Sequence, residues 1–267
     1  MAELRNEQVI PSVKPLPLLP DGPRRPEISS VAPCGLMELA ERFGSDKGLK
    51  HFERHGYARV YEALFAPLRE EPLRILEIGL LHSQDARWLD HPWENLGRAR
   101  GAAAPSLNMW SSYFPSAEVF GLDINDFTAV TLPRTRILQG DMGDPAALDR
   151  LVRETGGHFD IIVDDASHCS HHQQAALRRL FPELNSGGLY VIEDLHWQNP
   201  LWERPDAAKT QDLLLELADK QRRPVAADPG ELDRYVAGHL SEILFFDSLE
   251  PGAVLTARDA LAILRRS

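Results

Sequence analysis

The chain lacks the features that mark membrane-spanning and secreted proteins. None of its apolar runs approaches the roughly 20 residues that a helix needs to cross a bilayer. Its first residues lack the charged start and apolar core of a secretion signal. The two cysteines, Cys34 and Cys169, are too few for a disulfide framework and do not have the spacing of a zinc site. We therefore expect a cytoplasmic location and no membrane partner.

Positive charge is also scarce, since 29 lysines and arginines face 40 aspartates and glutamates and give a net charge of −11. Phosphate backbones bind basic surfaces, so we expect no nucleic-acid partner. With 43% hydrophobic and 26% charged residues, the composition is that of an ordinary globular protein. The 267 residues suffice for one large α/β domain or two small ones.

The first part of the chain is rich in proline. Six prolines fall within residues 11–26, which excludes a helix there and favours an extended chain. A loose tail is one interpretation, because terminal segments are often poorly tied down. An arm that packs on a neighbouring subunit is the other. We divide the chain into a proline-rich arm, residues 1–30, and one domain, residues 31–267.

Strand-like and helix-like segments alternate through most of the domain. Apolar residues at helical spacing predict helices at 35–44, 57–68, 105–114, 145–156 and 171–184. Apolar runs predict strands at 73–80, 117–124, 134–141, 159–165 and 187–195, and two closing strands at 241–249 and 261–267. Such alternation is typical of right-handed crossovers and a parallel sheet covered on both faces. The fold class is thus α/β, a Rossmann-like, doubly wound, mostly parallel sheet of about seven strands.

Acidic residues gather at the predicted strand ends. In open α/β sheets, ligands bind outside the carboxyl ends of the strands. A single acid at such a place is usually a helix cap or a solvated loop residue. Seven acids at five successive strand ends are better explained as one site, which we call the acidic rim: Glu77, Asp123, Asp141, Asp164, Asp165, Glu193 and Asp194.

One part of the rim suits a nucleoside. Asp123 ends a strand, where a carboxylate can accept hydrogen bonds from both hydroxyls of a ribose. However, no GxGxxG follows the first strand, and Gly79 and Asp123 are 44 positions apart, whereas dinucleotide sites have a spacing of about 20. A cofactor without a pyrophosphate fits better, and the cationic sulfonium of S-adenosylmethionine (SAM) tolerates an acidic rim. Gly79 would let this cofactor approach the backbone closely.

Two pairs of adjacent acids indicate a cation. Neighbouring side chains of a strand point to opposite faces, so Asp164 is assigned to the cofactor pocket and Asp165 to a second site. Asp165, Glu193 and Asp194 would converge if their strands are neighbours, and would repel one another without a cation. Their hard oxygen atoms suit Mg²⁺. His168 would lie beside the ion and accept a proton from an alcohol that the ion has acidified.

Several segments of the chain together carry a family resemblance. They are FGSDKG…HGYARVYEALFAPLR, RILEIG, PSLNMWSSYFPSAEVFGLDI, FDIIVDDASH and GGLYVIEDL. In these segments the chain resembles the metal-dependent sugar O-methyltransferases of antibiotic biosynthesis, of which the mycinamicin and macrocin enzymes are typical. The resemblance runs from about residue 36 to 196. It departs from the family at residues 82–104, where family members commonly have a short glycine-rich connection, and after residue 196.

The resemblance implies a class I methyltransferase fold, usually oligomeric. It implies that Asp165, Glu193 and Asp194 bind Mg²⁺ and that His168 is the general base. Glu77, Asp123 and Asp141 would lie around SAM. His55 and Tyr57 match an H-x-Y pattern of the family, and either contact a ligand or pack.

We expect an Mg²⁺- and SAM-dependent O-methyltransferase that acts on a sugar hydroxyl. The acceptor would be a glycosylated natural product or a nucleotide-deoxysugar, and the enzyme would be a homo-oligomer. Transfer to a phenol or catechol is the nearest alternative. A metal-dependent oxygenase would need two histidines and a carboxylate around an iron. A non-catalytic protein that keeps the fold is the third, since fold alone does not prove function.

Overall fold

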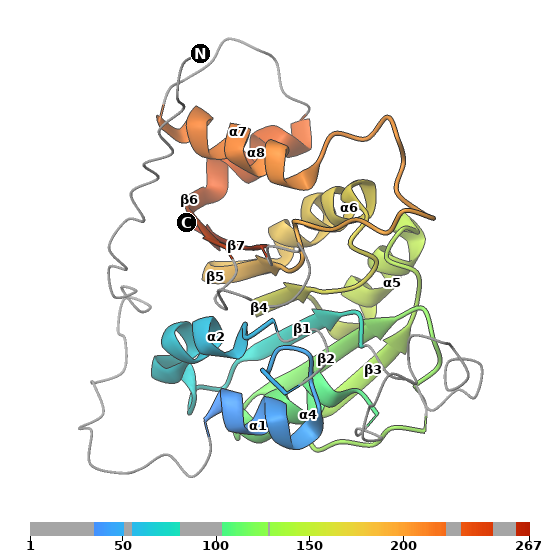
Figure 1. Ribbon diagram of the computed structural model, residues 1–267, viewed down its shortest axis with the longest axis vertical. Helices are drawn as coiled ribbons and strands as arrows, with labels where there is room; N and C mark the ends of the chain where they lie inside the picture. Colours follow the sequence, from blue (N-terminus) through green and yellow to red (C-terminus); the bar gives the residue numbers. More distant parts are fainter. Residues whose placement is uncertain (1–34, 51–54, 81–102, 128, 223–230, 248–259) are drawn as a thin grey trace.

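The computed structural model describes residues 35–50, 55–80, 103–127, 129–222, 231–247 and 260–267 (Figure 1). The predicted arm, residues 1–30, and nearly all of the connection at 82–104 lie outside these residues, as does Cys34. The division into an arm and a domain therefore stays a prediction.

Seven strands form one sheet in the order β3-β2-β1-β4-β5-β7-β6. Their bounds are β1 Arg74–Ile78, β2 Glu118–Asp123, β3 Thr135–Gln139, β4 Phe159–Asp164, β5 Leu184–Ile192, β6 Leu240–Asp247 and β7 Ala260–Arg266. The first five are mutually parallel, and β7 runs antiparallel to both β5 and β6. The predicted fold class, including the two closing strands, is confirmed. The chain order reverses between β1 and β4, which is the switch point where α/β sheets bind ligands.

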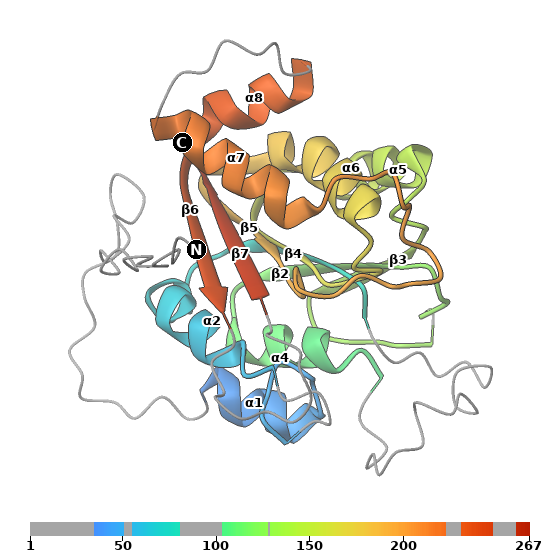
Figure 2. The same ribbon diagram turned by 45° about the horizontal axis from the view of Figure 1, so that its top comes forward.

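Helices cover both faces of the sheet (Figure 2). One face carries α1 Leu36–Phe43, α2 Ala58–Phe65 and α4 Pro105–Tyr113. The other carries α5 Pro145–Thr155, α6 Ser170–Leu180, α7 Thr210–Arg222 and α8 Glu231–His239. We did not predict α7 and α8 from the sequence. They pack Leu214, Leu217 and Val236 into the hydrophobic core on this second face of the sheet and extend the cover over β6 and β7.

The ends of the helices follow from local chemistry. Asp144 caps α5 by accepting a hydrogen bond from the backbone N–H of Ala146, and Pro145 fits the first turn. Helix α1 ends at Gly44, whose φ of 75° lies in the left-handed region that favours glycine. The chain turns back at this point, and the segment after α1 comes to lie against the carboxyl ends of the strands.

Alternation along the central strands decides which acids meet. In β4, Ile161 and Val163 belong to the core under α1, α2 and α4, whereas Ile162 belongs to the core under α5, α6 and α7. Continuing this period of two sends Asp165 to the first face and Asp164 to the second. The same count in β1 and β5 sends Glu77 and Glu193 to the first face. Three acids from neighbouring strands thus share one face.

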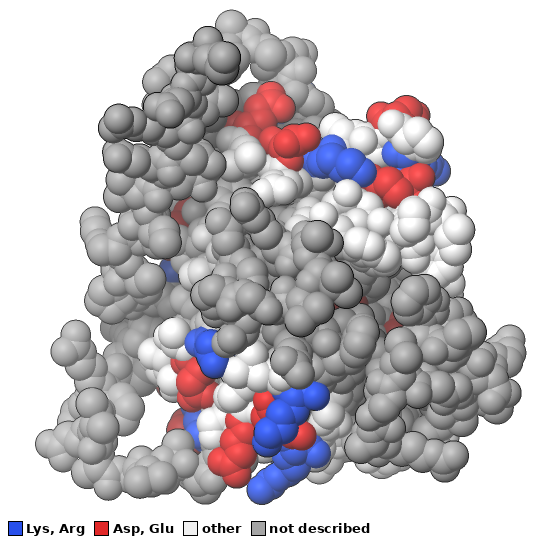
Figure 3. All heavy atoms as spheres, in the orientation of Figure 1, with Lys and Arg blue, Asp and Glu red and all other residues white. Residues whose placement is uncertain are grey.

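None of the helices within the described ranges combines the length and the apolar character needed to span a membrane. On the face drawn in Figure 3, the acidic and basic side chains of the described residues are interspersed.

Candidate active site at the carboxyl edge of the sheet

A buried lysine lies among the acids that share one face. The side chain of Lys47, in the turn after α1, has no exposed surface. Its Nζ lies 2.5 Å from Asp165 Oδ2, 3.1 Å from Glu193 Oε1 and 3.3 Å from Glu77 Oε1. A buried carboxylate needs a charged or hydrogen-bonding partner, and one ammonium serves three of them here.

Two tyrosines near the start of α2 hold the acids that end β5. Tyr61 donates its hydroxyl to Glu193 Oε1 at 2.5 Å, and Tyr57 donates to Asp194 Oδ1 at 2.7 Å. His55 stacks on the Tyr57 ring, and its Nδ1 lies 3.6 Å from the same oxygen of Asp194. His55 and Tyr57 thus pack on each other and contact a carboxylate of the site, and a contact of either residue with a ligand stays a prediction.

Asp165, His168 and Asp194 form a compact cluster of potential metal ligands. One ligand atom from each lies within 4.8 Å of the others. His168 Nε2 is 3.8 Å from Asp194 Oδ2, and the Nδ1 atom of the same ring is buried and accepts or donates no hydrogen bond among the described residues. Two carboxylates and an imidazole are a donor set that a divalent cation can use. The residues therefore fit the expected ion.

Burial and mutual repulsion raise the pKa values of the carboxyl groups around Lys47. Burial, opposed by Lys47, raises the pKa of Asp165 to about 6 and that of Glu77 to about 7. Burial and the nearby Asp165 raise the pKa of Glu193 well above its ordinary value. Burial alone would lower the pKa of Lys47, but Asp165, Glu193 and Glu77 outweigh it, and the ammonium stays charged. A divalent cation would relieve the remaining repulsion.

The backbone is unusual at two residues of the cluster. His168 has a φ of 55° and Asp194 a φ of 54°, values that residues other than glycine rarely adopt. Residues held in this region cost roughly 1–3 kcal/mol and gather at functional sites. Two of them in contact across neighbouring strand ends favour a functional reading of the cluster.

Asp123 and Asp141 are held by backbone N–H groups of nearby loops. Asp123 accepts the N–H groups of Leu80 at 2.8 Å and Asn125 at 2.7 Å, so both carboxylate oxygens are fixed beside the end of β1. Burial, partly offset by these two hydrogen bonds, raises the pKa of Asp123. Asp141 is exposed and accepts the N–H of Gly143 at 2.8 Å.

The structure shows why residue 79 has to be a glycine, which the sequence did not reveal. Its φ is 89°, and a side chain there would collide with the backbone of Asp165 and Ala166. The start of the loop after β4 thus crosses directly over the end of β1, which brings the two parts of the rim together. The cofactor's approach to Gly79 stays a prediction.

The structure separates Asp164 from the other rim residues. Asp164 is fully buried on the opposite face, where the Tyr190 hydroxyl lies 3.5 Å from its Oδ2. Burial and the neighbouring Asp165 raise its pKa to about 7. The rim therefore contains one acid directed into the core, and its assignment to the cofactor pocket stays a prediction.

A solved methyltransferase shares the fold of this chain. The MycE methyltransferase of the mycinamycin pathway, solved in complex with Mg, SAH and mycinamycin VI, superposes with a TM-score of 0.64 at 30% identity, over 87% of this chain and 53% of MycE. The chain is a homologue of sugar O-methyltransferases from antibiotic pathways. Its Rossmann-like sheet is therefore the class I methyltransferase fold, as predicted.

Proteins with similar sequences are also sugar O-methyltransferases of antibiotic pathways. A tetracenomycin-C 3'-O-methyltransferase of Streptomyces olivaceus, which acts on a 2-methoxy-rhamnosyl derivative, is 43% identical over 61% of this chain and 37% of its own. The mycinamicin VI 2''-O-methyltransferase of Micromonospora griseorubida is 32% identical over 81% of this chain and 51% of its own. The matched part thus spans about half or less of each of these relatives. No protein-family model matches the chain.

In this sugar O-methyltransferase homologue, an aromatic loop follows the cluster. The Trp197 ring lies edge-on to the His168 ring with centroids 5.6 Å apart, and 44% of Trp197 is exposed. Trp202 and Leu201, in the same loop, are more exposed still. The loop is the segment that departs from the family after residue 196. Exposed aromatics beside a reactive group are a common ligand surface. Trp88 and Trp93, in the connection at 82–104, lie outside the described ranges.

Sequence reasoning missed Lys47, Tyr61 and Trp110. Trp110 donates its indole N–H to Glu77 Oε2 at 3.1 Å. All three lie in segments that the family resemblance quoted, and that is the signal that could have found them.

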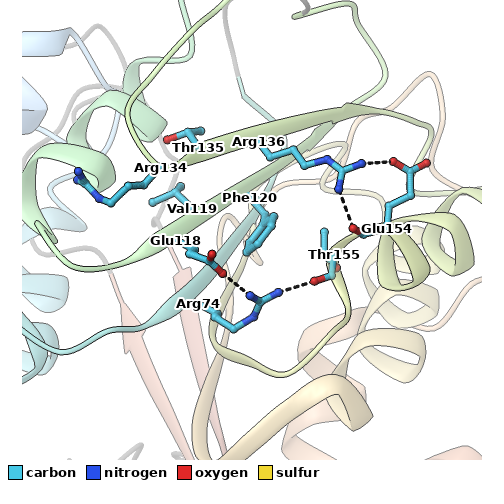
Figure 4. A pocket seen from close by; sticks show the side chains of 9 residues that line it. All are labelled: Arg74, Glu118, Val119, Phe120, Arg134, Thr135, Arg136, Glu154 and Thr155. Atoms are coloured by element: carbon cyan, nitrogen blue, oxygen red, sulfur yellow. Dashed lines mark hydrogen bonds and ion pairs between the residues drawn. The ribbon is translucent and has the colours of Figure 1, made fainter.

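A groove at the other end of the strands is a separate feature (Figure 4). It is lined by residues at the amino ends of β1, β2 and β3, including Arg74 and Arg136. Arg74 is engaged by Glu118 and by carbonyl oxygens, and Arg136 donates to the backbone and side chain of Glu154. Their donors are thus used within the protein, and the groove lies at the opposite edge from the acidic rim.

Proposed function

We propose that the chain is an Mg²⁺- and SAM-dependent O-methyltransferase that methylates a sugar hydroxyl of a glycosylated natural product. The observation that carries this proposal is the cluster of Asp165, Asp194 and His168 at the carboxyl edge of a methyltransferase sheet. The relatives with Mg, SAH and glycosylated antibiotics in their names support it.

Three acids would hold the ion. Asp165 and Asp194 belong to the compact cluster, and Glu193 lies beside them with its orientation fixed by Tyr61 and Lys47. A bound Mg²⁺ would act as a Lewis acid that orients the acceptor hydroxyl and lowers its pKa. The protein's part is to hold the carboxylates in place.

His168 would accept the proton. Its ring borders both Asp194 and Trp197, between the expected ion and the expected acceptor. As the hydroxyl oxygen attacks the methyl carbon, the carbon–sulfur bond breaks and the electron pair stays on sulfur. The hydroxyl proton passes to His168, and the products are the methyl ether and S-adenosylhomocysteine. Such transfer needs in-line alignment of oxygen, carbon and sulfur.

The cofactor would lie over the ends of β1, β2 and β3. Asp123 has both oxygens fixed by backbone donors and keeps free lone pairs for two ribose hydroxyls. Glu77 lies between this place and the metal cluster. Asp141, Gly79 and Asp164 complete the proposed cofactor set.

The acceptor, the compartment and the assembly belong to the same proposal. The exposed Trp197, Leu201 and Trp202 offer apolar contact area, which suits an aglycone better than a nucleotide. We propose a cytoplasmic homo-oligomer. In the described part of the sheet, β6 pairs on one side only and leaves an outer edge for a second copy.

The deciding experiment is a methyl-transfer assay with SAM labelled on its methyl group. The acceptors would be rhamnosylated polyketides, glycosylated macrolides, nucleotide-deoxysugars and simple phenols, each with Mg²⁺ and with EDTA. We expect label on the sugar of a glycoside and its loss with EDTA. Label on a phenol that survives EDTA would contradict both the acceptor class and the metal. Label on a nucleotide-deoxysugar alone would overturn the glycoside assignment and keep the chemistry.

A further inference from the structure

The proposed mechanism does not use the buried ammonium of Lys47. Besides its contacts with Asp165, Glu193 and Glu77, Nζ lies 3.9 Å from Asp46 Oδ1. A lysine side chain carries large rotamer entropy and a strongly hydrated charge. Its complete burial therefore needs a purpose that outweighs both costs.

The backbone around Lys47 is fixed independently of its side chain. Its carbonyl oxygen accepts the N–H of Ala58 at 2.9 Å, and the neighbouring carbonyls of Asp46 and Gly48 accept from His55 and Gly56. The turn after α1 is thus clipped to the start of α2. The backbone therefore holds the ammonium group of Lys47 near one defined place, and the carboxylates orient around it.

Lys47 acts on two of the three expected metal ligands. It fixes Oδ2 of Asp165 and bridges both oxygens of Glu193 at 3.1 and 3.2 Å. Asp165, which is held through Oδ2, presents its other oxygen in a fixed direction, and Glu193 is held through both oxygens. Asp194, the third expected ligand, is absent from the ion pairs of Lys47 among the described residues.

We propose that Lys47 is a positioning residue that orients Asp165 and Glu193 for binding of the divalent cation. The inference rests on the proposed function, because it takes the ion to bind at the cluster. A lysine that served only to neutralise acids for burial would affect stability alone. A positioning lysine affects metal affinity in a protein that is folded.

The test measures Mn²⁺ binding without SAM or acceptor, from the electron paramagnetic resonance signal of free Mn²⁺. For Lys47→Met, which keeps a similar chain without the charge, we expect a Kd raised about ten- to a hundredfold, the range for residues that support metal ligands. An unchanged or lower Kd in the folded variant would overturn the inference, since the ammonium would then be neutral toward the ion or opposed to it.

Leu39→Ala is the matched control. Leu39 lies on α1, next to the same turn, and is buried in the core. Its truncation should lower the unfolding temperature and leave the Mn²⁺ Kd unchanged. An equal rise in Kd for Leu39→Ala would mean that general loosening of α1 is the cause, and would overturn the positioning role.

A second variant covers the case in which Lys47→Met does not fold. Lys47→Met combined with Glu77→Gln removes one charge of each sign, so less uncompensated charge is buried. We expect the same rise in Kd, and a wild-type Kd would contradict the inference. Failure of the wild-type protein to bind Mn²⁺ is a different result, because it would remove the proposed metal function itself.

Discussion

The two parts of the acidic rim hold their carboxylates by different means. In the cofactor part, Asp123 and Asp141 accept hydrogen bonds from backbone N–H groups of adjacent loops. In the metal part, Asp165, Glu193 and Asp194 are held by side chains from a remote segment. Those side chains are Lys47, His55, Tyr57 and Tyr61.

The difference shows where each part of the site can fail. Backbone donors belong to the sheet and its loops, so no single side-chain substitution removes them. Side-chain donors from residues 47–61 depend on the packing of α1 and α2 and can be removed one by one. We therefore expect the metal part to be the more sensitive to substitution, and each prediction below includes a measurement of Mn²⁺ binding.

Asp194→Asn should have the largest effect. It removes a charge from the cluster and weakens the acceptor that Tyr57 and His55 share. We expect no measurable Mn²⁺ binding and no methyl transfer, while calorimetric binding of S-adenosylhomocysteine persists. Asp206→Asn, at an exposed acid of the loop before α7, is the control and should behave as wild type. Retained Mn²⁺ affinity in Asp194→Asn would place the ion elsewhere.

His168→Gln comes next and separates a base from a ligand. A general base contributes roughly 10²–10⁴-fold to turnover, so we expect kcat to fall by that factor. The Mn²⁺ Kd should change little if the ring only accepts the proton. A large rise in Kd would instead make His168 a metal ligand, which its place in the cluster allows. His171→Gln, in the first turn of α6 and three residues after His168, is the matched control.

The sequence predicted the parts of this site that depend on strand pattern alone. Apolar runs located the strands, and the period of two along them separated Asp164 from Asp165. The rule that ligands bind at the carboxyl ends of strands then identified the rim. These inferences need only local geometry, and the closing strands could be found for the same reason.

The remaining parts depend on contacts between distant residues. Lys47 and Asp165 are 118 positions apart, and no local pattern states that the turn after α1 crosses the strand ends. The demand for glycine at position 79 likewise comes from the backbone of Asp165. Alternation places Asp164 and Asp165 on opposite faces, but only the packing around Tyr190 shows that Asp164 is buried in the core.

Asp123→Asn tests the cofactor part. The amide would set an N–H group against the backbone N–H of Leu80 or Asn125, and it would lose a charged acceptor for the ribose. Hydrogen bonds to charged groups contribute about 1.5–3 kcal/mol, so SAM affinity should fall about ten- to a hundredfold. The Mn²⁺ Kd should stay within twofold of wild type. An equal loss of both affinities would mean that the two parts of the rim act as one unit. Glu154→Gln, at the remote groove, is the control for loss of an acid.

Tyr57→Phe should have the smallest effect of the series. It removes one hydroxyl from Asp194 Oδ1 and keeps the ring that stacks on His55. Loss of a hydrogen bond to a metal ligand costs about ten- to a hundredfold in metal affinity, and we expect the lower end because His55 still borders the same oxygen. Tyr113→Phe is the matched control, because the Tyr113 hydroxyl donates to Glu62, away from the cluster. Both variants should lose similar stability on thermal melting. Only Tyr57→Phe should weaken Mn²⁺ binding, and equal Mn²⁺ affinities would show that the side-chain support of the metal part serves folding alone.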